Sequence, residues 1–106
     1  MADDGTAGPT CRIDAEPTGA GVALSGHATA PASWSGRYSL AVRKIGPAGQ
    51  SNITQGGALT LEPSRDARFG QVAISLEPGA RYEAVLTMVA EGRSVECRAT
   101  GPGSPL

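Results

Sequence analysis

Residues Ser75–Leu86 read SLEPGARYEAVL and decide the fold class of this chain. Leu76 ends an apolar segment, and the Pro78-Gly79 pair that follows is typical of a turn. Tyr82 then opens a second segment in which small and large apolar residues alternate with polar ones. This order resembles a tyrosine corner, where a tyrosine hydroxyl of a Greek-key β-sandwich bonds to backbone a few residues upstream. A plain surface turn followed by an ordinary strand is the alternative interpretation.

Strand signals recur along the rest of the chain between glycines and prolines, and no helical periodicity lasts for more than a turn. The predicted strands are Cys11–Glu16, Val22–Thr29, Arg37–Ile45, Asn52–Gln55, a short one at Leu59 and Leu61, one carrying Val72, Ile74 and Leu76, Tyr82–Ala90 and Ser94–Thr100. Phe69 has the opposite parity to Val72, so Gly70 between them predicts a bulge. The sequence therefore predicts an all-β fold, an immunoglobulin-like antiparallel β-sandwich of about seven strands.

The alternation also predicts the core and the domain limits. The residues expected between the sheets are Leu24, Leu40, Val42, Ile74, Leu76 and Leu86. With 106 residues the chain is large enough for one core, and we expect a single domain over residues 11–100. Residues 1–10 and 101–106 are predicted to be flexible tails.

Charge and hydropathy limit the classes of partner. The formal net charge is −1, which favours neither nucleic acid nor an anionic membrane surface as a partner. No apolar run is long enough to cross a bilayer, so membrane insertion is not expected. We expect a monomer.

Two cysteines, Cys11 and Cys97, lie near opposite ends of the chain. Each has the inward parity of its predicted strand, and the first and last strands of a sandwich can lie side by side. We therefore predict a disulfide and an oxidising compartment, with two separately buried thiols as the alternative. The amino end carries no basic or apolar signal segment, and it reads as a mature secreted terminus behind an added start methionine. A genuine cytosolic start is the competing interpretation.

No group of residues predicts catalysis. His27 is the single histidine, and its position on the polar face of a strand predicts a solvated side chain. One histidine and two distant cysteines do not match the spacing of a zinc site. The chain has no Cys-x-x-Cys, and no nucleotide-binding loop is present. We expect no metal, no cofactor and no enzymatic activity.

The segment Arg43–Gly57, RKIGPAGQSNITQGG, is long for a hairpin connection and combines adjacent basic residues with small polar ones. From Gly46 to Gly57 its Gly-rich composition predicts a flexible loop with the short strand Asn52–Gln55 inside it. Together with the residues around Cys11, the segment from Gly21 to Gly26 and the motif Leu76–Tyr82, it resembles the curli assembly proteins of the CsgC/CsgH type, and CsgH most closely. The resemblance covers about residues 11–99.

The resemblance implies a periplasmic, chaperone-like β-sandwich that keeps the secreted curli major subunit from forming amyloid before export. The contact with that client would be transient. CsgC-type members are associated with a Cys-x-Cys pair, which this chain lacks, and a thiol-oxidoreductase role is therefore in doubt here.

Amyloid grows by adding strands to exposed backbone edges. An edge strand carrying polar and basic side chains could pair with a nascent strand, and glycines could interrupt the ladder that a fibril needs. The predicted client-binding residues are Arg43, Lys44, Ser51, Asn52 and Gln55, and the predicted structural residues are Pro78, Gly79 and Tyr82. Two alternative functions are an extracytoplasmic adhesion or interaction module, since this fold serves many partners, and a thiol-disulfide oxidoreductase using Cys11 and Cys97.

Overall fold

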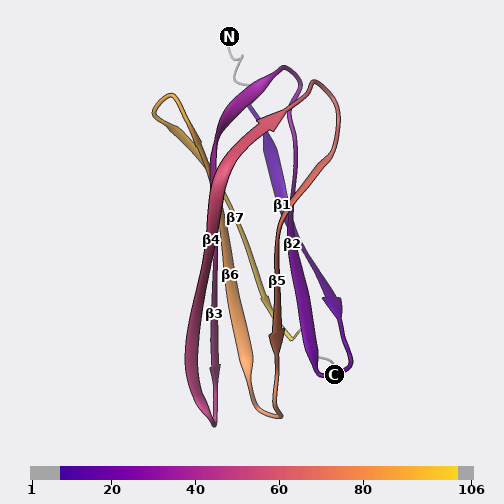
Figure 1. The fold of residues 1–106 in the computed structure, drawn as a ribbon, viewed down its shortest axis with the longest axis vertical. Coiled ribbons are helices and arrows are strands. Elements are labelled where there is room, and N and C mark those ends of the chain that lie inside the picture. The colour runs from indigo at the N-terminus through magenta and orange to yellow at the C-terminus, as the bar shows by residue number, and fades with distance from the viewer. Residues whose placement is uncertain (1–7, 103–106) are drawn as a thin grey trace.

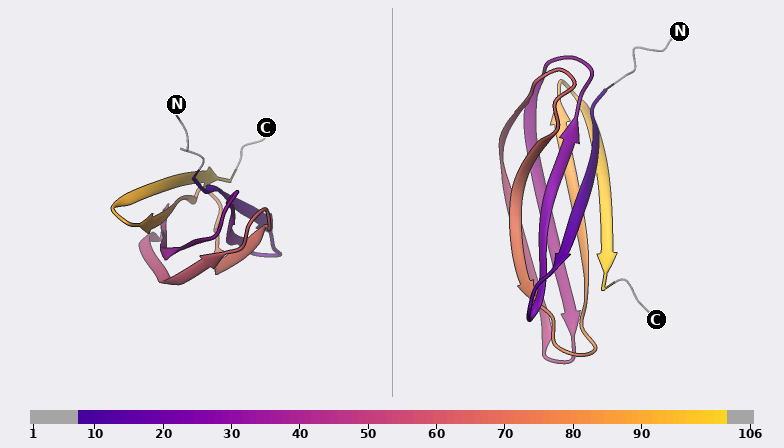
Figure 2. Two further views of the ribbon diagram at one scale, coloured as in Figure 1. Left: turned by 90° about the horizontal axis from the view of Figure 1, so that it is seen from above. Right: turned by 90° about the vertical axis from the view of Figure 1, so that its right-hand side faces the viewer.

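The computed structural model describes residues 8–102, which form seven strands and no helix within that range. The strands are β1 (Thr10–Pro17), β2 (Gly21–Thr29), β3 (Trp34–Gly46), β4 (Gly49–Leu61), β5 (Ala67–Ser75), β6 (Arg81–Ala90) and β7 (Arg93–Gly101). They build a three-stranded sheet in the order β1-β2-β5 and a four-stranded sheet in the order β4-β3-β6-β7. All neighbours are antiparallel and the two sheets form facing layers (Figures 1 and 2), so the predicted immunoglobulin-like sandwich is confirmed.

The core lies between the sheets because every second side chain of a strand points toward the opposite sheet. In β6, for example, Tyr82, Ala84, Leu86 and Met88 are buried. Of the predicted core residues, those that are buried are Leu24, Leu40, Val42, Ile74 and Leu86. Leu76 lies just beyond β5 and packs half-buried against this core.

The predicted bulge at Gly70 is confirmed. The pairing of β2 with β5 shifts register between Ser25 and Gly26, which face Gln71 and Phe69. Gly70 is the extra residue, and its φ of 65° is one that glycine adopts without strain. The bulge lets Phe69 as well as Val72 point into the sandwich.

The prediction of a flexible loop over residues 46–57 is wrong. Gly46 pairs directly with Gly49 around the turn at Pro47-Ala48, and β4 then runs for 13 residues opposite β3 without a register shift. The predicted short strands at residues 52–55 and 59–61 are thus parts of one strand. Pairing with β3 along its whole length outweighs the weak strand propensity of its glycines.

The turn predicted at Pro78-Gly79 is present. The backbone N–H of Ala80 donates to the carbonyl of Glu77 at 3.0 Å, and Gly79 has a φ of 88°. The Tyr82 side chain is buried against Gly101 of β7, and this burial raises the pKa of its hydroxyl. Within residues 8–102 that hydroxyl makes no hydrogen bond to the upstream backbone, so the bond that defines a tyrosine corner is not seen.

The predicted tails fall largely outside the described residues, which exclude 1–7 and 103–106. Thr10 and Gly101, predicted as tail residues, belong to β1 and β7. In the part of the chain that the structure describes, no helix is long and apolar enough to cross a membrane.

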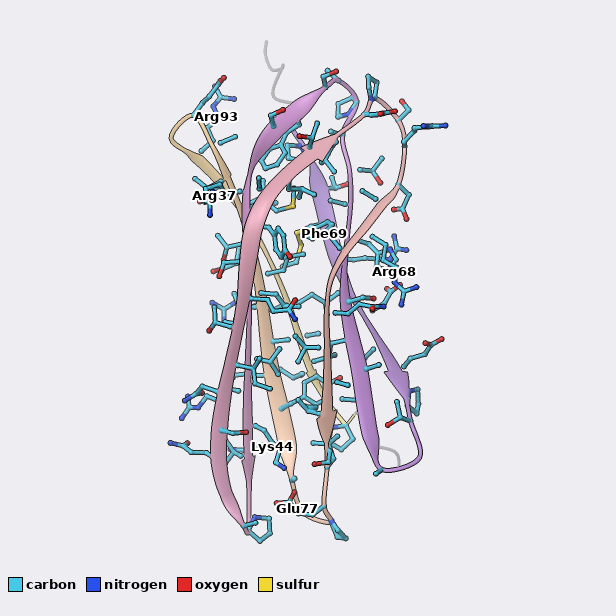
Figure 3. The ribbon with its side chains drawn as sticks, viewed as in Figure 1. Arg37, Lys44, Arg68, Phe69, Glu77 and Arg93 are labelled. Carbon is cyan, nitrogen blue, oxygen red and sulfur yellow. A yellow bond between two sulfur atoms is a disulfide. The ribbon has the colours of Figure 1, made fainter. Side chains whose placement is uncertain are left out.

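The end of the sandwich that carries the β3–β4 turn is fastened by Lys44 and Glu77 (Figure 3). Lys44 Nζ lies 3.0 Å from Glu77 Oε1 and donates a 3.0 Å hydrogen bond to the backbone oxygen of Ser75. A Cβ at Gly46 would lie 2.7 Å from the Glu77 carboxylate and 2.9 Å from Ala80 Cβ, so a larger residue there would displace the clamp. We call these contacts the Lys44–Glu77 clamp, which joins the two motifs Arg43–Pro47 and Leu76–Tyr82.

The disulfide predicted between Cys11 and Cys97 is present, and it joins β1 of one sheet to β7 of the other. These strands are the outermost of their sheets on that side and run next to each other (Figure 2, right). The bond closes this side of the sandwich covalently and is consistent with an oxidising, extracytoplasmic environment.

Replacing a core leucine tests the packing of the sheets. Leu40→Ala or Leu86→Ala should lower the free energy of unfolding by about 2–5 kcal/mol, because each removes fully buried methyl groups and leaves a cavity. Denaturant unfolding measures this, with Val89→Ala as the control, since Val89 is 44% exposed and should change stability by less than about 0.5 kcal/mol. Equal effects of the core and control variants would contradict the packing described above.

Reduction tests the contribution of the disulfide. Its cysteines are 86 residues apart, and closing so long a loop stabilises a fold by about 4–5 kcal/mol in the chain-entropy model. Reductant, or a double Cys→Ser variant, should therefore lower the melting temperature by at least about 10 °C. An unchanged melting temperature after complete reduction, verified by thiol alkylation and mass spectrometry, would contradict this role.

The clamp should make stability sensitive to acid. The hydrogen bond from Lys44 holds the pKa of the Glu77 carboxyl below its ordinary value of about 4.3. The ionised Glu77 carboxylate therefore stabilises the folded state at pH values above that ordinary pKa. This contribution to the free energy of unfolding is lost as the pH falls through the lower pKa of the folded state. Melting temperatures measured from pH 7 to pH 3 should fall less steeply for Glu77→Gln than for the parent. Glu62→Gln, which removes an exposed carboxylate, is the control and should follow the parent.

Candidate strand-addition site at the β4 edge

β4 is an edge strand that pairs with β3 on one side only. Gly46 and Gly49 flank a two-residue turn and so form a hydrogen-bonded pair, and such pairs alternate with non-hydrogen-bonded pairs along an antiparallel ladder. The even-numbered residues of β4 therefore direct their N–H and C=O groups away from β3. These residues are Gln50, Asn52, Thr54, Gly56, Ala58 and Thr60, and all of them are exposed. We call this row the β4 edge.

The β4 edge lacks the features that normally prevent strands from pairing with an edge. Charged side chains, prolines, bulges and covering segments serve this purpose in natural sheets. Gly49–Leu61, GQSNITQGGALTL, contains neither a charged residue nor a proline. It is also long and, within residues 8–102, makes no backbone hydrogen bond to any strand other than β3. Its backbone is therefore available to an extended segment.

The other three edge strands are protected. β1 has the sequence TCRIDAEP, with a charged residue at every second position from Arg12 to Glu16 and a proline at its end. β7 has the sequence RSVECRATG, with three charged residues. The disulfide also holds β1 and β7 against each other. β5 is interrupted by the bulge at Gly70, and its backbone carbonyl at Gln71 accepts a 2.7 Å hydrogen bond from Gln55 Nε2. β4 is the one unprotected edge in the described part of the chain.

Arg43 and Asn52 lie directly opposite each other on β3 and β4. Both are exposed on the outer face of the four-stranded sheet, and Glu83 of β6 continues the same row. They border a hollow of about 320 Å³ on that face. Of the five predicted client-binding residues, Asn52 thus belongs to the β4 edge and Arg43 lies beside it, and both face solvent.

Lys44, Ser51 and Gln55 lie on the opposite side of the same strands. Lys44 is 18% exposed and is held in the clamp, and Gln55 reaches across to β5. Arg43 and Lys44, adjacent in the sequence, do not form one exposed basic pair, because successive side chains of a strand point to opposite faces. The five predicted residues therefore surround the edge strand without forming one surface. Strand parity in the sequence could have separated them.

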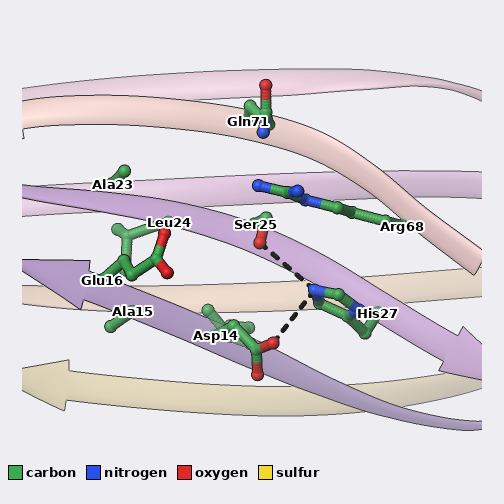
Figure 4. A pocket seen from close by; sticks show the side chains of 10 residues that line it. Asp14, Ala15, Glu16, Ala23, Leu24, Ser25, His27, Arg68 and Gln71 are labelled. Atoms are coloured by element: carbon green, nitrogen blue, oxygen red, sulfur yellow. Dashed lines mark hydrogen bonds and ion pairs between the residues drawn. The ribbon is translucent and has the colours of Figure 1, made fainter.

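His27 is not the solvated side chain expected from the sequence. Its side chain is 12% exposed, with Nε2 3.0 Å from Asp14 Oδ2 and Nδ1 3.3 Å from Asp66 Oδ2. Ser25 Oγ is 3.3 Å from the same Nε2 (Figure 4), and a hydrogen bond from Arg12 lowers the pKa of Asp14. These groups come from β1, β2 and the segment before β5, so sequence spacing could not reveal the cluster.

The cluster joins three segments of the chain rather than presenting a free reactive group. Ser25 is buried, and the ring nitrogen nearest its hydroxyl also contacts Asp14. Among the described residues, no group of three or more His, Cys, Asp or Glu side chains is placed to hold a metal ion. We interpret the cluster as a polar contact that holds β1 and the segment before β5 onto β2.

Comparison with known proteins identifies the family. The family model described as "CsgH protein" matches residues 10–100. The solution structure of CsgH from R. palustris is similar to this chain, with 33% sequence identity, a TM-score of 0.71, and coverage of 85% of this chain and 89% of that one. The E. coli curli protein CsgC has the same fold at 19% identity, with a TM-score of 0.71 and coverage of 89% of this chain and 98% of that one. A comparison with curated protein sequences gives no significant match. Because the family match spans nearly the whole sandwich, this chain belongs to the CsgH family of curli-associated proteins.

Proposed function

We propose that this protein is a periplasmic, chaperone-like inhibitor that delays amyloid formation by the curli major subunit. In this proposal, the β4 edge binds an extended segment of the subunit transiently. The observation that carries the proposal is the long, uncharged and unpaired β4 edge in a member of a curli-associated family. Strand addition to such an edge is a general mode of peptide recognition, in which backbone hydrogen bonds provide the affinity.

The shape of the sandwich explains why binding would delay fibril growth. A strand added to β4 would follow the right-handed twist of the four-stranded sheet, whereas the stacked sheets of amyloid are unusually flat. The edge at the far side of that sheet, β7, is charged and lies against β1. A bound segment would therefore be held in a conformation that does not match a growing fibril.

The arrangement of the two cysteines supports a structural role for them rather than thiol-disulfide exchange. Both form the disulfide between β1 and β7, and the chain has no other cysteine that could exchange with it. This arrangement favours the chaperone-like proposal over the thiol-oxidoreductase alternative. Arg43 and Asn52 would contact side chains of the bound segment that face the outer side of the sheet.

Proline at position 54 tests the edge directly. The N–H of Thr54 points away from β3, so Thr54→Pro removes a free donor without removing a bond of the ladder. Loss of this bond and the clash of the ring with an added strand should weaken client binding about tenfold. The delay of fibril formation, followed by thioflavin fluorescence at low molar ratio of inhibitor to curli subunit, should shorten accordingly.

The matched control is Glu96→Pro, which places proline at a free N–H position of the opposite edge strand β7. It should inhibit as well as the parent. Melting temperatures show whether each variant is folded, and Thr54→Lys, which adds an edge charge while keeping the N–H, serves if the proline variant is unstable. A folded Thr54→Pro and a folded Thr54→Lys that both inhibit like the parent would refute binding at the β4 edge.

A further inference from the structure

Two aromatic rings form the edge of the core on the side of the sandwich between β4 and β5, which the disulfide leaves open. The rings of Tyr38 and Phe69 meet edge to face, with centroids 4.9 Å apart. Both side chains pack against both hydrophobic clusters of the core, yet both remain only half-buried. A hollow of about 560 Å³ borders the two rings and Gln55 of β4. The hollow therefore adjoins the strand that we propose to bind an extended segment.

The polar side chains at the rim of the hollow are directed elsewhere. Gln55 Nε2 donates to the backbone oxygen of Gln71 at 2.7 Å. Arg68 lies opposite His27 in the pairing of β2 with β5, and it lines the pocket on the outer face of that sheet. Figure 3 shows Arg68 to the right of Phe69, beyond β5. An occupant of the hollow therefore meets the two aromatic rings.

Gly57 of β4 lies opposite Tyr38 in the pairing of β3 with β4. A Cβ built on Gly57 would lie 3.8 Å from the Tyr38 ring, an ordinary van der Waals distance, and its φ is outside the left-handed region. The fold therefore does not require glycine at this position. At Gly56, by contrast, a Cβ would lie 2.8 Å from the backbone oxygen of Tyr38. Glycine weakens a strand, and it often marks a place that a ligand or another backbone approaches closely. Gly57 thus leaves the Tyr38 ring accessible from the β4 edge.

The pairing pattern of β4 brings an added strand close to Gly57. The odd-numbered residues of β4 form the hydrogen-bonded pairs with β3, so with an added antiparallel strand they would form the non-hydrogen-bonded pairs, whose side chains lie closer together. Residues directly opposite each other on neighbouring strands share a face of the sheet. The residue opposite Gly57 would therefore point inward, as Tyr38 does. An aromatic residue in such a place compensates for the missing side chain of an edge glycine.

We propose that this hollow is a subsite for an aromatic side chain of the segment that adds to β4, at the position opposite Gly57. The inference rests on the proposed strand addition. The incoming ring packs over Gly57 against Tyr38 and Phe69, and it closes the core on this side of the sandwich. Backbone bonds would then provide the affinity of strand addition, and this subsite its selectivity. The partner is thus an extended segment with an aromatic residue on its inward face.

Peptides with one variable position test the preference. The probes are short peptides of alternating serine and threonine, with phenylalanine, leucine or glutamine at the centre, titrated into the folded protein and followed by amide chemical shifts. We expect the phenylalanine peptide to bind about tenfold more tightly than the glutamine peptide and about threefold more tightly than the leucine peptide, because aromatic pairs add to the gain from burial. Nuclear Overhauser effects between the phenylalanine ring of the peptide and the Tyr38 ring should locate the bound side chain.

Two variants should remove the preference without preventing strand addition. Gly57→Val fills the space beside Tyr38 while keeping every backbone group of β4, and all three peptides should then bind within about twofold of one another. Phe69→Leu removes one ring and keeps most of the apolar volume, so the phenylalanine and leucine peptides should bind within about twofold of each other. Ala58→Val, on the exposed outer face of β4, is the control and should keep the preference. Gly57→Ala serves if the valine variant is unstable.

The outcomes separate the subsite from the proposed function. Equal binding of all three peptides by the parent, or an unchanged preference in a folded Gly57→Val, would overturn the subsite while leaving strand addition intact. Peptide binding that persists in Thr54→Pro would instead refute the β4 edge itself. A dimer of the protein that forms with concentration and is lost in Thr54→Pro, measured by sedimentation velocity, would assign the edge to a second copy and overturn the assignment to a partner.

Discussion

The disulfide between Cys11 and Cys97 joins the two sheets covalently along one side of the sandwich, which we call the closed side. The opposite side, between β4 and β5, is the open side. On the closed side, the charged strands β1 and β7 lie against each other. On the open side, a side-chain hydrogen bond from Gln55 joins β4 to β5, and the ring of Tyr38 lies between their backbones. Each side of the sandwich thus has two edge strands, and backbone groups remain free along β4 on the open side.

The Lys44–Glu77 clamp lies at the end of the open side that carries the β3–β4 turn. It joins the turn between β3 and β4 to the turn between β5 and β6, and so links the sheet that carries the β4 edge to the opposite sheet. Lys44 and Glu77 belong to the two motifs that stand out in the sequence, and their contact brings these motifs together at one end of the sandwich. We therefore assign Lys44 a role in positioning the hairpin that presents the edge.

Much of the fold could be predicted because it depends on local patterns. Alternating apolar residues predicted the strands and five of the buried core positions, and the change of parity at Phe69 predicted the bulge at Gly70. Strand β4 was predicted only as two short pieces because its glycines and small polar residues have weak strand propensity. It is a strand because β3 pairs with it throughout, and β3 is held in turn by β6.

The sequence by itself determined the sandwich, the pairing of the two cysteines, and the family, since periodicity, parity and motifs are written along the chain. The tertiary structure decided which predicted site residues lie together, because it holds Lys44 against Glu77 of the opposite sheet's connection and places Arg43 opposite Asn52 on the outer face. It also brought Gln55 to Gln71 and His27 between Asp14 and Asp66. Such contacts depend on strand order and register, which sequence spacing does not specify.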